Sequence, residues 1–179
     1  SSFIKNINHL KAAHYFYFDL DKKLASRPIK WWKPNISTNN KISFQEASLK
    51  LRELFINSVK LHLRSDVPIG ITLSGGLDSS SIASVIKYID PYIKLKTFSF
   101  ISDDKKISEE KWIDYLNSKL NYNSQKVRLK SKELKVDIKD LCAKQEEPFG
   151  STSVYAGYKI FSKVKQAGVT VIIEGQGAD

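Results

Sequence analysis

The chain of 179 residues has a single cysteine, Cys142, and no methionine. One cysteine excludes an internal disulfide framework and any zinc site made of clustered cysteines. No apolar run approaches the roughly 18–20 residues needed to cross a bilayer, and the first residues lack the layout of a signal peptide. We therefore expect a soluble, cytoplasmic protein with no membrane partner and, because no initiator is present, a segment of a longer chain.

Acidic residues are scarce relative to basic ones: 19 Asp and Glu stand against 29 Lys and Arg, a formal net charge of +10. Such an excess can mark a nucleic-acid partner, because lysines release counterions when they condense on phosphates. Here the lysines are scattered from Lys5 to Lys165, without the arginine clusters and interleaved aromatic residues of a nucleic-acid groove. The pattern favours solvated helix faces, so no nucleic-acid partner is expected.

What is present is the ordinary mixture of a globular domain, with 41% hydrophobic and 27% charged residues, which argues against a disordered chain. Aromatic residues in 13–20 and 29–32 favour two strands, and the polar residues 34–40 are typical of a linker. Ser43 and Glu46 then form a capping-box pattern that predicts a helix to about Arg64. Its apolar residues fall on one helical face: Ala47, Leu51, Leu54, Phe55, Val59 and Leu63.

Strands and helices alternate in the rest of the chain. Apolar runs predict buried strands at 67–73, 95–101 and 169–173, and a further strand is expected at 124–129. The intervening segments predict helices at 80–89, from Ser108 onward, at 131–144 and at 153–166, with Ser108 as a cap and Trp112 on an inner face. This order predicts an α/β fold, a parallel sheet with helices on both faces, whose ligands bind at the carboxyl ends of the strands.

The loop Leu73-Ser74-Gly75-Gly76-Leu77-Asp78-Ser79-Ser80 connects the first of these strands to a helix. Adjacent glycines allow a sharp turn and a close approach to a ligand, and the free N–H groups of a helix start favour phosphate. The GxxxxGK[ST] spacing of a Walker loop is absent. Asp78 would repel a bare phosphate, so its presence is explained if Mg²⁺ bridges it to the phosphates.

Ser74 to Ser79 resembles the SGGxDS pyrophosphate loop of the ATP pyrophosphatase superfamily, whose members transfer AMP and release pyrophosphate. The stretches 146–153 and 174–179 make the chain similar to the glutamine-hydrolysing asparagine synthetases. Residues 13–15 and Trp31-Trp32 resemble the closing strands of that family's amidotransferase domain. The resemblance implies an adenine-nucleotide α-hydrolase-like sandwich at 41–179, preceded at 1–38 by a remnant of a glutamine amidotransferase domain.

The resemblance also implies roles for individual residues. The ATP phosphates are expected on Ser74, Gly75, Gly76, Ser79 and Ser80, bound by backbone and hydroxyl donors. Adenine and ribose are expected near Leu73, Phe100, Glu174 and Gly175, although Phe100 could equally belong to the core. Asp78 and Asp179 match the two carboxylates that ligate Mg²⁺.

The residues expected to bind the acceptor acid match the family pattern less closely than the phosphate loop does. Glu147 is a candidate carboxylate, and Ser151 and Thr152 either bind the acceptor or cap the helix that follows. Glu174 stands where many members have a small or hydroxyl residue, and Gln176 stands where many have a glutamate. The expected catalytic residues are Asp78, Glu147 and Gln176, but an amide cannot be a base, so Gln176 is expected only to hydrogen-bond the substrate.

We do not expect His14, His62 or Cys142 to take part in the reaction. His14 and His62 have no metal-spaced partners and are interpreted as structural. Cys142 lies in a predicted helix, so it cannot be the N-terminal nucleophile of a glutaminase.

The implied activity is an ATP-dependent ligase that adenylates the side-chain carboxylate of aspartate or a related acid. It then transfers ammonia supplied from glutamine by an upstream domain, while this segment alone is expected to be inactive. A homodimer is left open. Two alternatives remain: a β-lactam-synthetase-like cyclising ligase, and a degenerate, non-catalytic nucleotide- or nucleic-acid-binding module.

Overall fold

The computed structural model describes residues 2–37 and 41–177. It divides into two compact units, Ser1–Phe44 and Gln45–Asp179, which are described separately. No helix within these described ranges is long and apolar enough to cross a membrane.

The first unit contains four two-residue strands: β1 (His14–Tyr15), β2 (Phe18–Asp19), β3 (Leu24–Ala25) and β4 (Ile29–Lys30). β1 pairs with β4 and β2 with β3, both antiparallel. The prediction of one continuous strand over 13–20 is wrong. The ladder is interrupted because the N–H of Tyr17 donates to the Ser26 hydroxyl (3.0 Å) instead of a backbone carbonyl.

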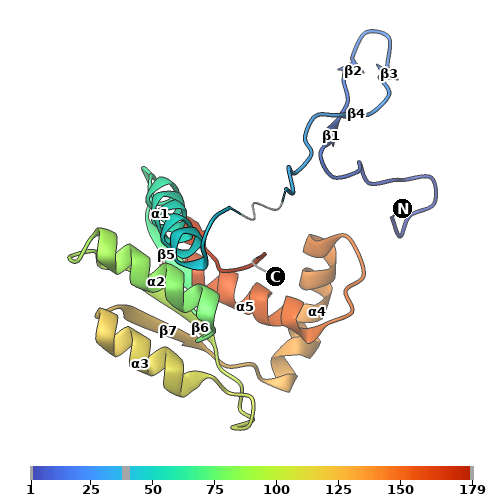
Figure 1. The fold of residues 1–179 in the computed structure, drawn as a ribbon. Helices are drawn as coiled ribbons and strands as arrows, with labels where there is room; N and C mark the ends of the chain where they lie inside the picture. Colours follow the sequence, from blue (N-terminus) through green and yellow to red (C-terminus); the bar gives the residue numbers. More distant parts are fainter. Residues whose placement is uncertain (1, 38–40, 178–179) are drawn as a thin grey trace. The chain divides into compact units, whose positions relative to one another are not determined.

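The second unit confirms the predicted alternation of helices and strands (Figure 1). Its elements are α1 (Phe44–His62), β5 (Ile69–Thr72), α2 (Leu77–Ile89), β6 (Lys96–Phe100), α3 (Glu110–Leu120), β7 (Asn123–Val127), α4 (Ser131–Gln145), α5 (Thr152–Gln166) and β8 (Val171–Ile173). The four strands form one sheet in the order β7-β6-β5-β8, and every pairing is parallel. The first and fourth predicted strands are therefore neighbours, and the loops that follow them leave the same edge of the sheet.

Two apolar clusters hold helices on the two faces of this sheet. On one face, buried Ile71 and Leu73 pack with Val59 of α1, Ile86 of α2 and Ile113 of α3. On the other face, Phe98 of β6 packs with residues of α5 and the turn that follows it, Val164 and Val169. Figure 1 shows the resulting layers, with α2 and α3 on one side of the sheet and α5 on the other. The predicted α/β class with helices on both faces is confirmed.

Helix α1 uses only half of its predicted apolar face. Val59 is buried and Phe55 and Leu63 are half-buried, but Leu51 and Leu54 are 68% and 58% exposed. The sequence period places all of these residues on one side of the helix, yet the core reaches only the C-terminal half of α1. The predicted apolar face is therefore covered by the core only from Phe55 onward.

Helices α4 and α5 are joined by polar side chains as well as by buried Leu141 and Tyr155. Asp137 accepts hydrogen bonds from the Tyr155 hydroxyl (2.7 Å) and from Lys159 Nζ (3.1 Å). Lys159 also pairs with Glu133 at 3.0 Å. The hydrogen bonds from Tyr155 and Lys159 lower the pKa of Asp137, and burial, followed by the bond to Asp137, raises the pKa of Tyr155 to about 12.

These shifts predict an acid-sensitive contact between α4 and α5. A carboxylate whose pKa is lowered on folding stabilises the fold above its unfolded pKa, and this contribution is lost as the pH falls through the folded pKa. We expect urea unfolding at about pH 6 and about pH 3 to show a smaller loss of stability in Asp137→Asn than in the wild type. The control is Asp66→Asn, which removes an exposed carboxylate and should keep the wild-type pH dependence. Equal losses in all three proteins would contradict the assignment.

Candidate functional site

The loop between β5 and α2 has the backbone of an anion-binding turn. Gly75 has φ +87°, a conformation that side chains rarely adopt, and Gly76 is the extended N-cap of α2 without a side-chain cap. Within the described part of the chain, no group accepts a hydrogen bond from the N–H groups of Leu77 and Asp78. Free donors at the start of a helix, where the helix dipole is positive, are suited to phosphate.

The hydroxyls of Ser74 and Ser79 are engaged inside this loop. Their oxygen atoms lie 2.9 Å apart, Ser79 Oγ accepts from the Ser74 N–H, and Ser74 Oγ accepts from the Gly76 N–H. Ser79 is buried, and the buried hydroxyl of Ser80 has no hydrogen-bond partner among the described residues. The two bonded serines therefore fix the shape of the turn, while the N–H groups of Leu77 and Asp78 and the Ser80 hydroxyl remain available to a ligand.

Leu73 attaches the entry of the loop to the sheet. Its N–H donates to Phe98 O (2.9 Å), its carbonyl accepts from the Ser99 hydroxyl (2.6 Å), and its side chain is buried in the core. Only backbone atoms of Leu73 thus face the loop. Phe100, at the carboxyl end of β6, is 38% exposed and can still contact a base.

The turn at Gly75 rests on the first turn of α3. A Cβ atom at Gly75 would lie 3.2 Å from Glu109 Cβ and 3.3 Å from Trp112 Cβ. The prediction of an inward-facing Trp112 is wrong, since its side chain is 53% exposed while Ile113 is buried. The predicted cap is also shifted: the N-cap is Glu109, without a side-chain cap, and Ser108 Oγ lies at 3.4 Å from the Glu110 N–H.

The loop after β8 lies directly against the loop between β5 and α2, residues 73–80, which is the candidate phosphate loop. A Cβ atom at Gly175 would approach the Ser79 backbone nitrogen to 2.9 Å and Asp78 Cβ to 3.2 Å, so only glycine fits without a shift. Pairing of β5 with β8 produces this contact. Asp78 is exposed, and its carboxylate has no hydrogen-bond or ion-pair partner in the described ranges, so it can accept a divalent cation. Asp179, the second predicted ligand, lies outside the described residues.

A cavity of about 980 Å³ opens between α1, α2 and the segment 174–177. Its lining brings together five predicted site residues: Asp78, Ser80, Glu174, Gly175 and Gln176. The sequence analysis missed Arg52 of α1, which lines the same cavity. No motif surrounds Arg52, and it lines the cavity because the fold places α1 beside α2.

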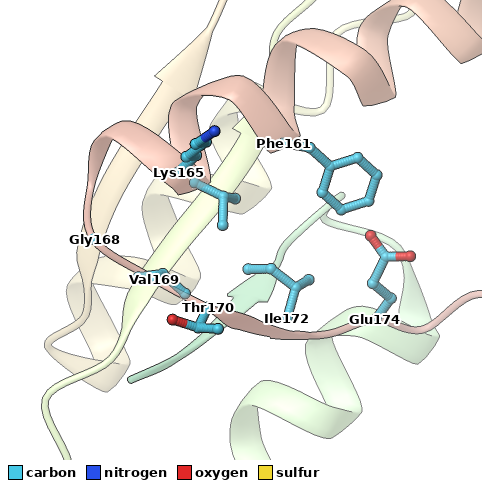
Figure 2. A pocket seen from close by; sticks show the side chains of 8 residues that line it. Phe161, Lys165, Gly168, Val169, Thr170, Ile172 and Glu174 are labelled. Atoms are coloured by element: carbon cyan, nitrogen blue, oxygen red, sulfur yellow. The ribbon is translucent and has the colours of Figure 1, made fainter. Parts of the chain in front are cut away.

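A second groove, of about 670 Å³, lies between α5 and β8 (Figure 2). Phe161 and Lys165 of α5 and Ile172 of β8 are among its lining residues. It shares only Glu174 with the first cavity and does not reach the phosphate loop, so it is separate from the candidate site.

The predicted acceptor residues lie in or beside the connection between α4 and α5 and do not line either cavity. Ser151 is the N-cap of α5, where its hydroxyl accepts from the Ser153 N–H at 3.2 Å, so the capping alternative holds for this residue. Thr152 is the exposed first residue of α5, and Glu147 is half-buried in the connection.

His14 and His62 each make a local contact with the backbone. Their Nδ1 atoms lie 2.8 Å from the carbonyl oxygens of Ala12 and Ser58 respectively. In the part of the chain that the structure describes, no group of three or more His, Cys, Asp or Glu side chains could hold a metal ion. The structural interpretation of these histidines stays a prediction.

The family model for asparagine synthase matches residues 50–179. The chain belongs to the asparagine synthase family. Its match begins inside α1 and includes the phosphate loop, the loop after β8 and the connection between α4 and α5. The match therefore covers both loops that form the candidate site.

Individual members of the asparagine synthase family align with most of the chain. It is 33% identical over 188 residues to the putative glutamine-hydrolysing asparagine synthetase 2 of Methanocaldococcus jannaschii, covering 99% of this chain and 34% of that protein. It is 32% identical over 130 residues to asparagine synthetase 1 of Bacillus subtilis, covering 73% of this chain and 20% of that protein. The chain thus spans about a third or less of these relatives.

Among solved structures, the chain is similar to the NH3-dependent NAD synthetase from Campylobacter jejuni, with 15% identity and a TM-score of 0.43. That match covers 73% of this chain and 56% of the other.

Proposed function

We propose that the chain is the ATP-binding part of a ligase that activates the side-chain carboxylate of aspartate, or of a closely related acid, as an acyl-adenylate. Glutamine-derived ammonia then gives asparagine, AMP and pyrophosphate. Membership of the asparagine synthase family supports this proposal. The observation that carries it is the contact of Gly175 with Ser79, which sets Asp78, Glu174 and Gln176 around the free N–H groups of the phosphate loop.

The proposed reaction has two steps. A carboxylate oxygen of the acceptor attacks the α-phosphorus of ATP, and the bond from that phosphorus to the β-phosphate oxygen breaks, so that pyrophosphate leaves. Ammonia next attacks the activated carbonyl carbon, the nitrogen loses a proton, and AMP leaves. Both steps depend on alignment and on neutralisation of the charge that develops on the leaving phosphates.

The residues of the phosphate loop fit the first step. The N–H groups of Leu77 and Asp78 and the dipole of α2 would bind the phosphate oxygens, and the Ser74–Ser79 bond keeps the turn in shape before ATP arrives. Asp78 would hold Mg²⁺, with Asp179 as its proposed second ligand. When bound, Mg²⁺ supplies positive charge next to the departing pyrophosphate.

The second step needs a proton acceptor that Gln176 cannot supply. Its amide, in the lining of the cavity, can donate to or accept from the acceptor but cannot take up a proton at neutral pH. Glu147 is the carboxylate proposed on the acceptor side, from the connection between α4 and α5. In this proposal Gln176 orients the substrate and does not act as a base.

The direct test is a product assay on the protein with whatever flanking sequence it is encoded with. We expect repeated turnover of ATP to AMP and pyrophosphate only when Mg²⁺, aspartate and either ammonia or glutamine are all present. A screen of other carboxylic acids in the same assay separates this reaction from a cyclising ligase, which would release AMP without ammonia. ATP binding without AMP release under any of these conditions would support a non-catalytic module and contradict the proposal.

A further inference from the structure

The first turn of α3 supports the phosphate loop but has no ordinary cap. Its N-cap, Glu109, makes no side-chain cap hydrogen bond, and the Ser108 hydroxyl is only at 3.4 Å from the Glu110 N–H. Uncapped helix starts fray, because their first N–H groups have no partner within the helix. Glu109 and Trp112 nevertheless lie within 3.2–3.3 Å of the position that a side chain at Gly75 would occupy. A further interaction with this turn would therefore help to hold it in place.

That interaction is an ion-pair network from the carboxyl end of β7. Arg128 Nη2 donates to both carboxylate oxygens of Glu110, at 2.8 and 2.7 Å, and its Nη1 donates to Asp103 at 3.1 Å. Lys126 Nζ donates to Glu110 at 2.9 Å and to Asp114 at 2.8 Å. These bonds join β7, the first turn of α3 and the loop between β6 and α3.

The network has the properties that make exposed ion pairs effective. A single exposed pair contributes little to stability, but a charge-assisted contact within a network of several charges contributes more. Glu110 receives three such hydrogen bonds, and those from Lys126 and Arg128 keep its pKa below the ordinary value. These hydrogen bonds favour the ionised form of Glu110, which is the form that accepts them.

We propose that Arg128 is a positioning residue for the phosphate loop, acting through Glu110 and the first turn of α3 on Gly75. It touches neither ATP nor the acceptor. Loss of Arg128 should release the first turn of α3, and the turn at Gly75, which rests on it, should lose its fixed shape. The role in ATP handling rests on the proposed function, whereas the mechanical connection from Arg128 to Gly75 does not.

The connection can be measured without nucleotide, by amide hydrogen exchange in the full chain. In Arg128→Met, we expect faster exchange at residues 109–113 and also at the Ser74 and Gly76 amides, which donate to hydroxyls inside the loop. The matched control is Lys144→Met, which removes the same charge and breaks the exposed Lys144–Asp140 pair on α4. The control should leave all of these amides unchanged.

Nucleotide binding supplies the second measurement. We expect Arg128→Met to raise the dissociation constant for MgATP about fivefold, Arg128→Lys to recover part of that loss, and Lys144→Met to have no effect. Glu110→Gln breaks the same contact from the other side and serves if Arg128→Met does not fold.

The outcomes separate the two claims. Faster exchange at 109–113 with unchanged Ser74 and Gly76 amides would overturn the positioning role, since Arg128 would then support only α3. The same follows if the loop exchanges faster but MgATP binds with wild-type affinity. Failure of the wild type to bind MgATP would overturn the proposed function, and the exchange data would still decide the connection to Gly75.

Discussion

Replacing Asp78 by asparagine is expected to weaken magnesium-dependent ATP binding by about 1–3 kcal/mol, the scale of losing one charged contact. The substitution should leave the fold intact, because the carboxylate is exposed and has no polar partner in the described ranges. Titration calorimetry with ATP in the presence and absence of Mg²⁺ measures the effect. The loss should appear only with Mg²⁺, and without the metal the variant should bind ATP at least as well as the wild type, because a negative charge near the phosphates is gone.

Asp66→Asn is the control for this titration, since it removes an exposed carboxylate outside the phosphate loop and the cavity. Equal MgATP affinities for the wild type and Asp78→Asn would remove Asp78 from the metal site. That outcome would leave the N–H groups at the start of α2 as the remaining feature for phosphate.

Replacing Gly175 by alanine is expected to abolish measurable ATP binding and to destabilise the fold by about 1–3 kcal/mol. The added methyl group would lie 2.9 Å from the Ser79 backbone nitrogen and 3.3 Å from the Asp78 carbonyl carbon. Both neighbours are backbone atoms that cannot rotate away, so either the loop after β8 or the first turn of α2 must shift. A shift of either one separates Glu174 and Gln176 from the free N–H groups of the phosphate loop.

Gly157→Ala is the matched control for Gly175→Ala. Gly157 lies inside α5, and a methyl group there meets no atom within 4 Å. Alanine is the better helix former, so we expect this variant to be slightly more stable than the wild type and to bind ATP normally. Urea unfolding and calorimetry on both variants check the pair, and normal ATP binding by Gly175→Ala would show that the two loops act independently.

The pattern of the sequence predicted the second unit well because each element carries a local signal. Buried strands such as 69–72 are continuous apolar runs, and α5 has Ser151 as its cap. The pairing of β5 with β8, by contrast, joins segments that are distant in sequence, and no local signal marks it.

The wrong burial predictions share one physical cause, which is that periodicity does not reveal where a core ends. Leu51 and Leu54 have the spacing of core residues, and Trp112 has the large apolar side chain of one, but all three residues are more than half exposed. Arg52 and Arg128 were missed because each matters through residues distant in sequence, and no local motif marks such a contact. The roles of Glu147 and Asp179 stay predictions.

The attachment of Leu73 to β6 determines which part of the site can move. One backbone hydrogen bond, one hydrogen bond from the Ser99 hydroxyl and a buried side chain fasten this residue to the sheet, whereas Gly75 and Gly76 immediately beyond it have no side chains. If this loop opens and closes, we expect it to pivot at these glycines, with the strand as its fixed base. Under the proposed function, rearrangement of a bound triphosphate would then be a local hinge motion of a few residues, with no need to deform the sheet.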